Sequence, residues 1–427
     1  MTSQATRERD QAEGNGAGGV YILGGAQTDF ARNWAREGLG IDAMMAEALH
    51  QGLEATGLDA SEIETAHIGN FTGELFCGQG QLGGIFASLH PDLSGVPTSR
   101  HEAACASGSM AVLSAMAEIE AGRYDLACVL GVEYMRNVPG QTAAEHLGAA
   151  AWHGREWTDA RYLWPAAFSD LIDAYSEKYG EVDYAHLGEI ARINYENGRR
   201  NPFSQTRNWS FTPESFTEHD EANPVIEGRV RRNDCGQVTD GAATVFLASA
   251  KRARAYAEKR GLKLSDLARI EGWGHRTAPM LLSDKLKEGR NTRYVLPQVQ
   301  KTIAECFGRA GVGDVFALDA IETHDCFAMT EYAAIDSFGI TAPGESWKAI
   351  EEGVIAADGR LPVNPSGGLI GLGHPVGATG VRMMLDGYRQ VTGRAGACQV
   401  EGARRVGLLN IGGSTTTIAA FVVGAAI

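Results

Sequence analysis

The sequence predicts an α/β protein built around a mostly parallel, covered sheet. Residues 20–25, VYILGG, form a buried apolar run that ends in glycines, and residues 40–56 have helical periodicity. Residues 65–69, TAHIG, form a second short apolar run. A predicted helix rich in Ala, Met and Leu at 105–122 is followed by the apolar run YDLACVLG at 124–131. Strands that alternate with helices favour parallel strands covered on both faces.

The chain after Ala268 loosely repeats this organisation. Its strand candidates are 268–273, 316–321, 405–411 and 416–424. In each half a reactive residue opens a helix of small residues, Cys105 before ASGSM and His374 before PVGATG. In each half that helix leads to a buried run that ends in glycine, LACVLG or VGLLNIGG. We therefore expect two similar α/β halves that face one site.

Residues 138–234 differ in character from both halves. They hold four tryptophans and two Asn-Pro pairs, and we interpret them as an inserted, partly helical loop domain. The run GAATVFLASA that begins at Gly241 is expected to be a strand that returns to the first half. This division gives an N-terminal half made of 19–137 and 235–267 and a C-terminal half made of 268–427.

Composition excludes several function classes. The 427 residues suffice for two or three domains, and the net charge of -15 argues against nucleic acid or an anionic membrane as a partner. None of the seven cysteines forms a C-x-x-C pair, so we expect no metal site and reduced thiols, as in the cytoplasm. Residues 1–18 are polar, predict a disordered tail and lack the apolar core of a signal peptide. The last apolar run, 418–427, is too short to span a bilayer.

Cys105 is the candidate nucleophile. It lies where a helix is expected to begin, and unpaired backbone N–H groups and the helix dipole favour a thiolate there. Its small neighbours, Ala103, Ala104, Ala106 and Gly108, leave room for a substrate carbonyl. A lone cysteine is more often a buried structural residue, so that alternative stays open at this point.

His374 is the candidate base. It lies in NPSGGLIGLGHPVGATG, where glycines allow tight turns and close backbone approach. A histidine in such a turn can take a proton from a thiol or donate a hydrogen bond to an oxyanion. The alternative is a histidine that caps a helix.

The stretch THDCFAMTE, which begins at Thr323, holds three reactive side chains in a row. If it continues a strand, His324 and Cys326 point into the pocket and Asp325 points away to a structural partner. The alternative is a tight turn in which Asp325 caps the following helix. A thiol with a reference pKa of about 8.5 can move a proton on the carbon beside a thioester.

Together these segments resemble the thiolase superfamily. CASGSM resembles its nucleophile motif, GHPVGATG its histidine motif, and RRNDCGQVTDGAATVFLAS the strand that returns after its loop domain. HDCF resembles the sterol-carrier-protein type of thiolase. The resemblance implies a thiolase fold, with two βαβαβαββ halves in five α-β-α-β-α layers and an inserted loop domain that covers coenzyme A. It also implies a homodimer.

The resemblance also implies roles for the site residues. Cys105 is then the acylated nucleophile, His374 activates it, and Cys326 is the acid/base. His324 and His374 border the oxyanion hole for the thioester enolate. The backbone N–H groups of Cys105 and Gly412 are expected to form a second oxyanion hole.

One segment departs from the ordinary thiolases, whose late C-x-G motif supplies the acid/base cysteine. The matching residues here are Asn410, Ile411 and Gly412, with no thiol. An amide does not titrate near neutrality, so Asn410 cannot be the base, and we expect proton exchange to survive its loss. No segment resembles the lipid-transfer domain of the sterol-carrier-protein type.

The resemblance therefore predicts an acetyl-CoA C-acyltransferase that takes acyl-CoA and coenzyme A as substrates, without a tightly bound cofactor. Alternatives are a condensing enzyme that needs a small OB-like partner subunit, a β-ketoacyl synthase, and a non-catalytic acyl-CoA or lipid binder. Four arginines of the loop domain are candidate contacts for coenzyme A phosphates, although solvated surface positions are the commoner case. They are Arg192, Arg199, Arg200 and Arg207.

Overall fold

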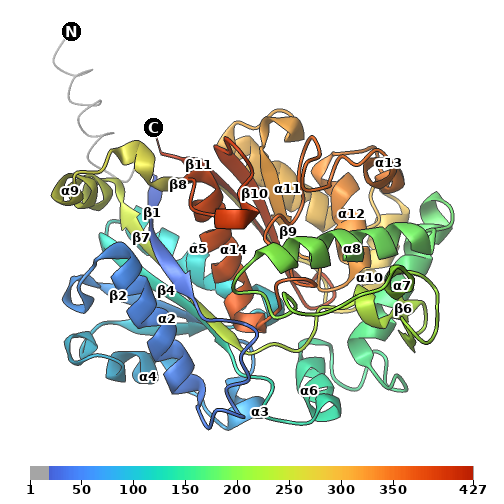
Figure 1. Ribbon diagram of the computed structural model, residues 1–427, viewed down its shortest axis with the longest axis horizontal. Coiled ribbons are helices and arrows are strands. Elements are labelled where there is room, and N and C mark those ends of the chain that lie inside the picture. The colour runs from blue at the N-terminus through green and yellow to red at the C-terminus, as the bar shows by residue number, and fades with distance from the viewer. Residues whose placement is uncertain (1–18, 427) are drawn as a thin grey trace.

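The computed structural model describes residues 19–426, so the tail predicted at 1–18 lies outside the described residues. Its main feature is a nine-stranded sheet in the order β3-β2-β4-β7-β1-β8-β11-β10-β9 (Figure 1). The strands are β1 (Val20–Gln27), β2 (Thr65–Gly69), β3 (Thr98–His101), β4 (Leu126–Glu133), β7 (Gly241–Ser249), β8 (Ala268–Thr277), β9 (Ala320–Thr323), β10 (Arg405–Gly412) and β11 (Thr417–Ala425).

Thirteen α-helices lie between these strands along the described part of the chain. They are α2 (Ile41–Thr56), α3 (Gly73–Cys77), α4 (Leu82–Ser88), α5 (Ser107–Glu120), α6 (Gly140–Leu147), α7 (Leu163–Tyr179), α8 (Tyr184–Arg200), α9 (Ala250–Arg260), α10 (Leu282–Arg290), α11 (Pro297–Ala310), α12 (Ala328–Phe338), α13 (Ser346–Glu351) and α14 (Thr379–Val391). Within residues 19–426, no helix has both the length and the apolar character needed to cross a membrane.

The prediction of a mostly parallel sheet is wrong. Strand β2 pairs in parallel with β3 and β4, and β9 pairs in parallel with β10, but the other neighbouring strands are antiparallel. Strands β10 and β11 are separated by a short turn, which allows an antiparallel hairpin but no parallel crossover. The strand expected at 316–321 begins only at Ala320, because Asp314 accepts a hydrogen bond from the Phe316 N–H (3.0 Å) and caps a short 3₁₀ turn.

Two halves meet in the middle of this sheet. Strands β1 and β8 pair over three residues only, from Val20 opposite Ile270 to Ile22 opposite Ala268. Helices α5 and α14 lie between the strands of the two halves and share one apolar core with both (Figure 1). Helices α2 and α9 cover the outer face of one half, and α11 and α12 cover that of the other. The predicted α/β fold of five layers is confirmed.

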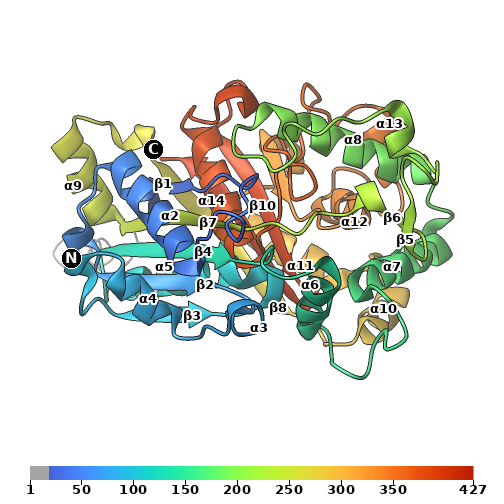
Figure 2. The ribbon, with the colours of Figure 1, turned by 60° about the horizontal axis from the view of Figure 1, so that its bottom comes forward.

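Residues 138–234 contribute helices α6, α7 and α8 and a separate two-stranded sheet, β5 (Val225–Glu227) with β6 (Val230–Arg231). Helices α7 and α8 bury apolar faces against α12, as the shared cluster around Tyr175, Leu187 and Tyr332 shows. In Figure 2 these green helices cover the end of the C-terminal half. The segment therefore lies beside the stretch that carries Cys326.

Candidate active site

Cys105 lies in a 3₁₀ turn, Ala104–Ala106, directly before helix α5. The preceding Ala104 has φ +50°, a left-handed conformation that L-residues rarely adopt. Ser107 stabilises this turn because its hydroxyl accepts from the Ala103 N–H (2.9 Å) and donates to the Ala104 carbonyl (2.6 Å). The half-buried thiol is thereby held at the wall of a cavity.

Glycines bring the cysteine and histidine motifs together. A Cβ atom on Gly108 of α5 would lie 2.8 Å from the Gly377 carbonyl oxygen, and one on Gly380 of α14 would lie 2.3 Å from a backbone nitrogen of α5. No side chain fits in either gap, so the two helices approach as backbone against backbone. The segments that lead into these helices carry Cys105 and His374, which explains why both motifs are rich in small residues.

His374 is a buried, neutral imidazole with a defined tautomer. Burial lowers its pKa to about 3. Its Nδ1 lies 2.7 Å from the Thr379 hydroxyl, and that hydroxyl donates its own hydrogen to the Pro375 carbonyl (3.0 Å). Nδ1 must therefore carry the proton and donate it, which leaves Nε2 with a free lone pair. Nε2 has no hydrogen-bond partner among the described residues and can act as a base.

His324 lies beside His374, with ring centroids 5.3 Å apart and planes at 86°. One ring nitrogen of each histidine and the Cys105 sulfur lie within 4.8 Å of one another. Burial lowers the pKa of His324 well below its ordinary value, and nearby His374 lowers it further. Its Nδ1 contacts the Asn410 side-chain amide (3.1 Å), and its Nε2 has no partner among the described residues.

The HDCF stretch is not a continuation of strand β9, which ends at Thr323. Cys326 nevertheless lines the same cavity as Cys105. Asp325 is fully buried and does not cap helix α12, so the capping alternative is wrong. Its carboxylate instead accepts hydrogen bonds from the Leu369 N–H (2.6 Å), the Ile370 N–H (3.0 Å) and the Asn194 amide (3.0 Å). Asp325 thus ties this stretch to the glycine-rich loop before His374.

Burial favours the protonated form of both thiols. Burial raises the pKa of Cys105 to about 12, although hydrogen bonds from the backbone N–H groups of Gly413 and of Cys105 itself lower it. Burial, with Cys105 nearby, raises the pKa of Cys326 well above its ordinary value. The expected thiolate at Cys105 is wrong because desolvation outweighs the helix terminus, and the expected near-neutral pKa of Cys326 is wrong for the same reason.

The second oxyanion hole was expected at the N–H groups of Cys105 and Gly412. Besides the N–H of Cys105 itself, the N–H that contacts the Cys105 sulfur belongs to Gly413, the residue after Gly412, which also lines the cavity. Gly412 is the last residue of β10 and pairs with Thr417. Its role as a donor stays a prediction, and Gly413 becomes a second candidate.

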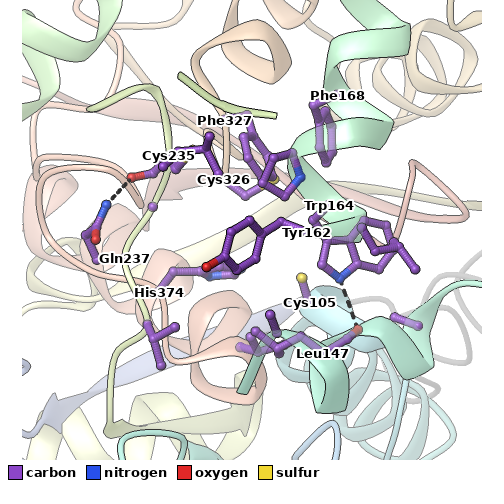
Figure 3. A pocket seen from close by; sticks show the side chains of 18 of the residues that line it. Cys105, Leu147, Tyr162, Trp164, Phe168, Cys235, Gln237, Cys326, Phe327 and His374 are labelled. Atoms are coloured by element: carbon purple, nitrogen blue, oxygen red, sulfur yellow. Dashed lines mark hydrogen bonds between the residues drawn. The ribbon is translucent and has the colours of Figure 1, made fainter. Parts of the chain in front are cut away.

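The cavity in front of these groups has a volume of about 290 Å³. Figure 3 shows the Cys105 sulfur among its lining side chains, with His374 and Trp164 nearby. Most of the lining is apolar or aromatic: Phe71, Leu147, Tyr162, Trp164, Phe168 and Phe327. A third cysteine, Cys235, also lines it. Sequence reasoning had not assigned Cys235 to the site, although it lies in the quoted segment RRNDCGQV.

Glu133 is a buried residue that the sequence reasoning missed. Its carboxylate accepts hydrogen bonds from the N–H groups of Phe71 (2.8 Å), Thr72 (3.2 Å) and Gly377 (3.0 Å). Burial raises its pKa to about 7. It joins the loop after β2 to the turn after His374, and its position at the end of β4 was the available signal.

Lys285 is a second buried, charged residue that the sequence reasoning missed. Its buried ammonium nitrogen lies within 3.0 Å of four acceptors: the Met280 carbonyl, the Ser414 carbonyl and hydroxyl, and the Thr416 hydroxyl. Burial lowers its pKa to about 7. It thereby fixes the turn between β10 and β11, which includes Gly413. Its sequence context, a polar helix, gives no sign of this role.

The four candidate arginines do not line the cysteine cavity. Arg192 pairs with Glu189 and Glu196, and Arg207 pairs with Asp29. The arginine among the lining residues is Arg232.

Comparison with known proteins agrees with this geometry. The family model described as "Thiolase, N-terminal domain" matches residues 20–192, and that described as "Thiolase C-terminal domain-like" matches residues 284–425. The chain is 30% identical over 409 residues to an acetyl-CoA acetyltransferase of Methanothermobacter thermautotrophicus, covering 94% of this chain and 98% of that protein. It is 27% identical to human sterol carrier protein 2, covering 90% of this chain and 68% of that protein.

Solved structures share the fold. The Ltp2-ChsH2(DUF35) aldolase matches with a TM-score of 0.74 at 20% identity, covering 96% of this chain and 98% of that one. An acetyl-CoA acetyltransferase from Syntrophomonas wolfei matches with a TM-score of 0.67 at 19% identity, covering 96% and 99%. The chain therefore belongs to the thiolase superfamily and is an acyltransferase with the thiolase fold.

Proposed function

We propose that the protein is an acetyl-CoA C-acyltransferase, which cleaves 3-ketoacyl-CoA with coenzyme A through an acyl-cysteine or runs the reverse Claisen condensation. The observation that carries this proposal is that Cys105, Cys326 and His374 line one largely apolar cavity, with His324 directly beside Cys105 and His374. A thiol beside a neutral imidazole can form a thioester, and a second thiol can move a proton at the adjoining carbon. Homologues named acetyl-CoA acetyltransferase support the same reaction class.

In the first half-reaction, the Cys105 sulfur attacks the 3-keto carbon while His374 Nε2 takes the thiol proton. The bond between C2 and C3 breaks, so the acyl group stays on sulfur and the electron pair stays on an acetyl-CoA enolate. Cys326 gives its proton to C2. The N–H groups of His324 and the protonated His374 stabilise the enolate oxygen until that transfer.

In the second half-reaction, coenzyme A attacks the acyl-Cys105 carbonyl and its thiol proton passes to the Cys326 thiolate. The tetrahedral oxyanion accepts hydrogen bonds from the backbone N–H groups of Cys105 and of Gly412 or Gly413. As the bond to Cys105 breaks, His374 returns its proton to the sulfur. Both thiols regain their protons, so the cycle needs no external acid or base.

Cys326 begins both directions as a proton donor, to C2 in cleavage and to the departing coenzyme A sulfur when acyl-CoA acylates Cys105 in condensation, so its protonated state suits either direction. The apolar lining of the cavity suits an acyl chain. On this basis we propose a role in fatty acid β-oxidation or related lipid metabolism. The proposed cytoplasmic location rests on the expectation of reduced thiols. Coenzyme A and acyl-CoA act as substrates, with no tightly bound cofactor.

We further propose that residues 138–234 form the loop domain that covers coenzyme A, inserted between 19–137 and 235–267 of the N-terminal half, with 268–427 as the C-terminal half. Exposed Arg232 is the candidate phosphate contact, because it lines the cavity at the edge of this segment. A homodimer is also proposed. Strand β3 ends the sheet and is partly exposed, so its free edge can pair with a second copy.

The test is incubation with a panel of 3-ketoacyl-CoAs and coenzyme A, with thioester products followed by mass spectrometry. We expect acetyl-CoA and a shortened acyl-CoA in equal amounts. Cys105→Ser is expected to abolish both products, whereas Cys77→Ser, which changes a cysteine outside the cavity, keeps them. Binding of acyl-CoA without products from any substrate would favour the non-catalytic binder instead.

The second candidate is an acyl-transfer or condensing enzyme that needs a small partner subunit. The match to the Ltp2-ChsH2(DUF35) aldolase, whose name joins two components, favours keeping it. Purification from the native host separates the two candidates. A stoichiometric small protein that is required for turnover supports the second, and full turnover by the isolated chain supports the first.

A further inference from the structure

Asn410 connects the nucleophile turn to His324. The residue is 2% exposed and lies in strand β10. Its Nδ2 lies 3.2 Å from the Cys105 carbonyl oxygen and 3.1 Å from His324 Nδ1. Its Oδ1 lies 2.7 Å from the Ser109 hydroxyl. One amide thus contacts three groups from two other segments of the site.

These contacts determine which way the amide points. The Cys105 carbonyl can only accept a hydrogen bond, so the atom that faces it must be the donating NH₂ group. The Ser109 hydroxyl can donate to the oxygen on the opposite side. A reversed Asn410 would place its oxygen against the Cys105 carbonyl oxygen, with repulsion in place of a hydrogen bond.

The orientation of Asn410 in turn determines the tautomer of His324. The NH₂ group can only donate, so Nδ1 of His324 must accept and cannot carry a proton. A neutral imidazole then carries its proton on Nε2. His374 has the opposite tautomer, because its Nδ1–H donates to Thr379. The two neighbouring rings therefore offer one N–H donor and one lone pair.

We propose that Asn410 is a positioning residue, which fixes the tautomer of His324 so that Nε2–H is the donor to the thioester oxygen while His374 Nε2 is the base. Its role in the reaction rests on the proposed function. The proposal revises the expectation that proton exchange survives the loss of Asn410. Both imidazoles are chemically alike, so without such partners either could serve as donor or base.

The direct test is nitrogen-15 NMR of the full chain labelled at histidine, with His324 and His374 assigned by single His→Gln variants. We expect His324 to be protonated at Nε2 and His374 at Nδ1. A wild-type His324 protonated at Nδ1 would overturn the proposal. This readout needs no turnover, so it remains informative even if 3-ketoacyl-CoA is not the substrate.

The functional test compares Asn410→Leu, which keeps the volume but donates no hydrogen bond, with Thr323→Val. Thr323 is buried next to His324, and its hydroxyl has no partner among the described residues, so its replacement is a matched control. Exchange of the acetyl-CoA methyl protons for deuterium should fall about ten- to a hundredfold in Asn410→Leu. This is the scale measured when a residue that orients a histidine in a metal site is removed. Thr323→Val should keep the wild-type rate.

The tautomer measurement on Asn410→Leu separates positioning from a general structural effect. We expect the His324 signals to show a mixture of tautomers, or the Nδ1–H form, in a variant whose thermal unfolding remains cooperative. An unchanged Nε2–H signal together with unchanged exchange would overturn the proposal.

Discussion

Acylation of Cys105 should continue in mildly acidic solution. The base in the proposed reaction is His374, whose pKa is lowered to about 3 because the ring is buried. An imidazole with a lowered pKa stays neutral as the pH falls, until the pH approaches that lower pKa. Neutral His374 should therefore be available at pH 5, where an exposed histidine is protonated.

The size of the effect follows from the two pKa values. An imidazole with the reference pKa of about 6.5 is roughly three-quarters neutral at pH 7 and about 3% neutral at pH 5, a loss of roughly 25-fold. An imidazole with a pKa of about 3 stays almost fully neutral over the same range. The rate of Cys105 acylation is proportional to the fraction of His374 that is neutral. The rate at pH 5 should therefore be within about twofold of the rate at pH 7.

The assay is single-turnover transfer from acetyl-CoA, with acid quenching and intact-protein mass spectrometry between pH 5 and 8. Near-ultraviolet circular dichroism at each pH shows that the protein stays folded, and His374→Gln gives the rate without the base. A fall of 20-fold or more in the acylation rate at pH 5, with the protein still folded, would refute the claim that buried, neutral His374 is the base.

Further predictions concern the second thiol and two buried cations. Cys326→Ala should still be acylated at Cys105 by acetyl-CoA but should lose deuterium exchange at the methyl carbon, as NMR would show; full exchange would make Cys326 a packing residue. Lys285→Met leaves several buried acceptors unpaired, at about 1–3 kcal/mol each, and should lower the melting temperature and slow transfer from acyl-Cys105 to coenzyme A. The guanidinium of Arg382 is fully buried and lies 2.8 Å from the Asp386 carboxylate. Arg382→Met should therefore reduce the free energy of unfolding, measured in urea, by about 3–5 kcal/mol. A reduction below about 1 kcal/mol would contradict this prediction.

Local patterns in the sequence were enough to predict most elements of the fold. Helix α2 and strand β2 begin and end within about a residue of their predicted ranges, because each is encoded by a continuous periodic or apolar run. Strand direction was not predictable in this way. Whether β7 runs parallel or antiparallel to β4 depends on the path of the chain through residues 138–234, which no local pattern reports.

Within the site, residue types were predictable and their states were not. Cys105 and His374 lie in motifs of small residues because the helices that follow them must approach closely. Glycine and alanine are needed for that approach, so the sequence reports it. The protonation of Cys105 depends on desolvation by distant segments. The donor role of Nε2 on His324 depends on Asn410, 86 residues away in the chain. Protonation states and tautomers of this kind can be inferred only when the three-dimensional structure is known.

The acyl-cysteine intermediate can be observed directly. The protein is incubated with a 3-ketoacyl-CoA in the absence of free coenzyme A, quenched in acid, digested and mapped by mass spectrometry. We predict one acyl group, shorter than the substrate by two carbons, on the peptide that contains Cys105, and its loss when coenzyme A is added before the quench. An acyl group on Cys235 or Cys326, or on no cysteine, would contradict Cys105 as the nucleophile.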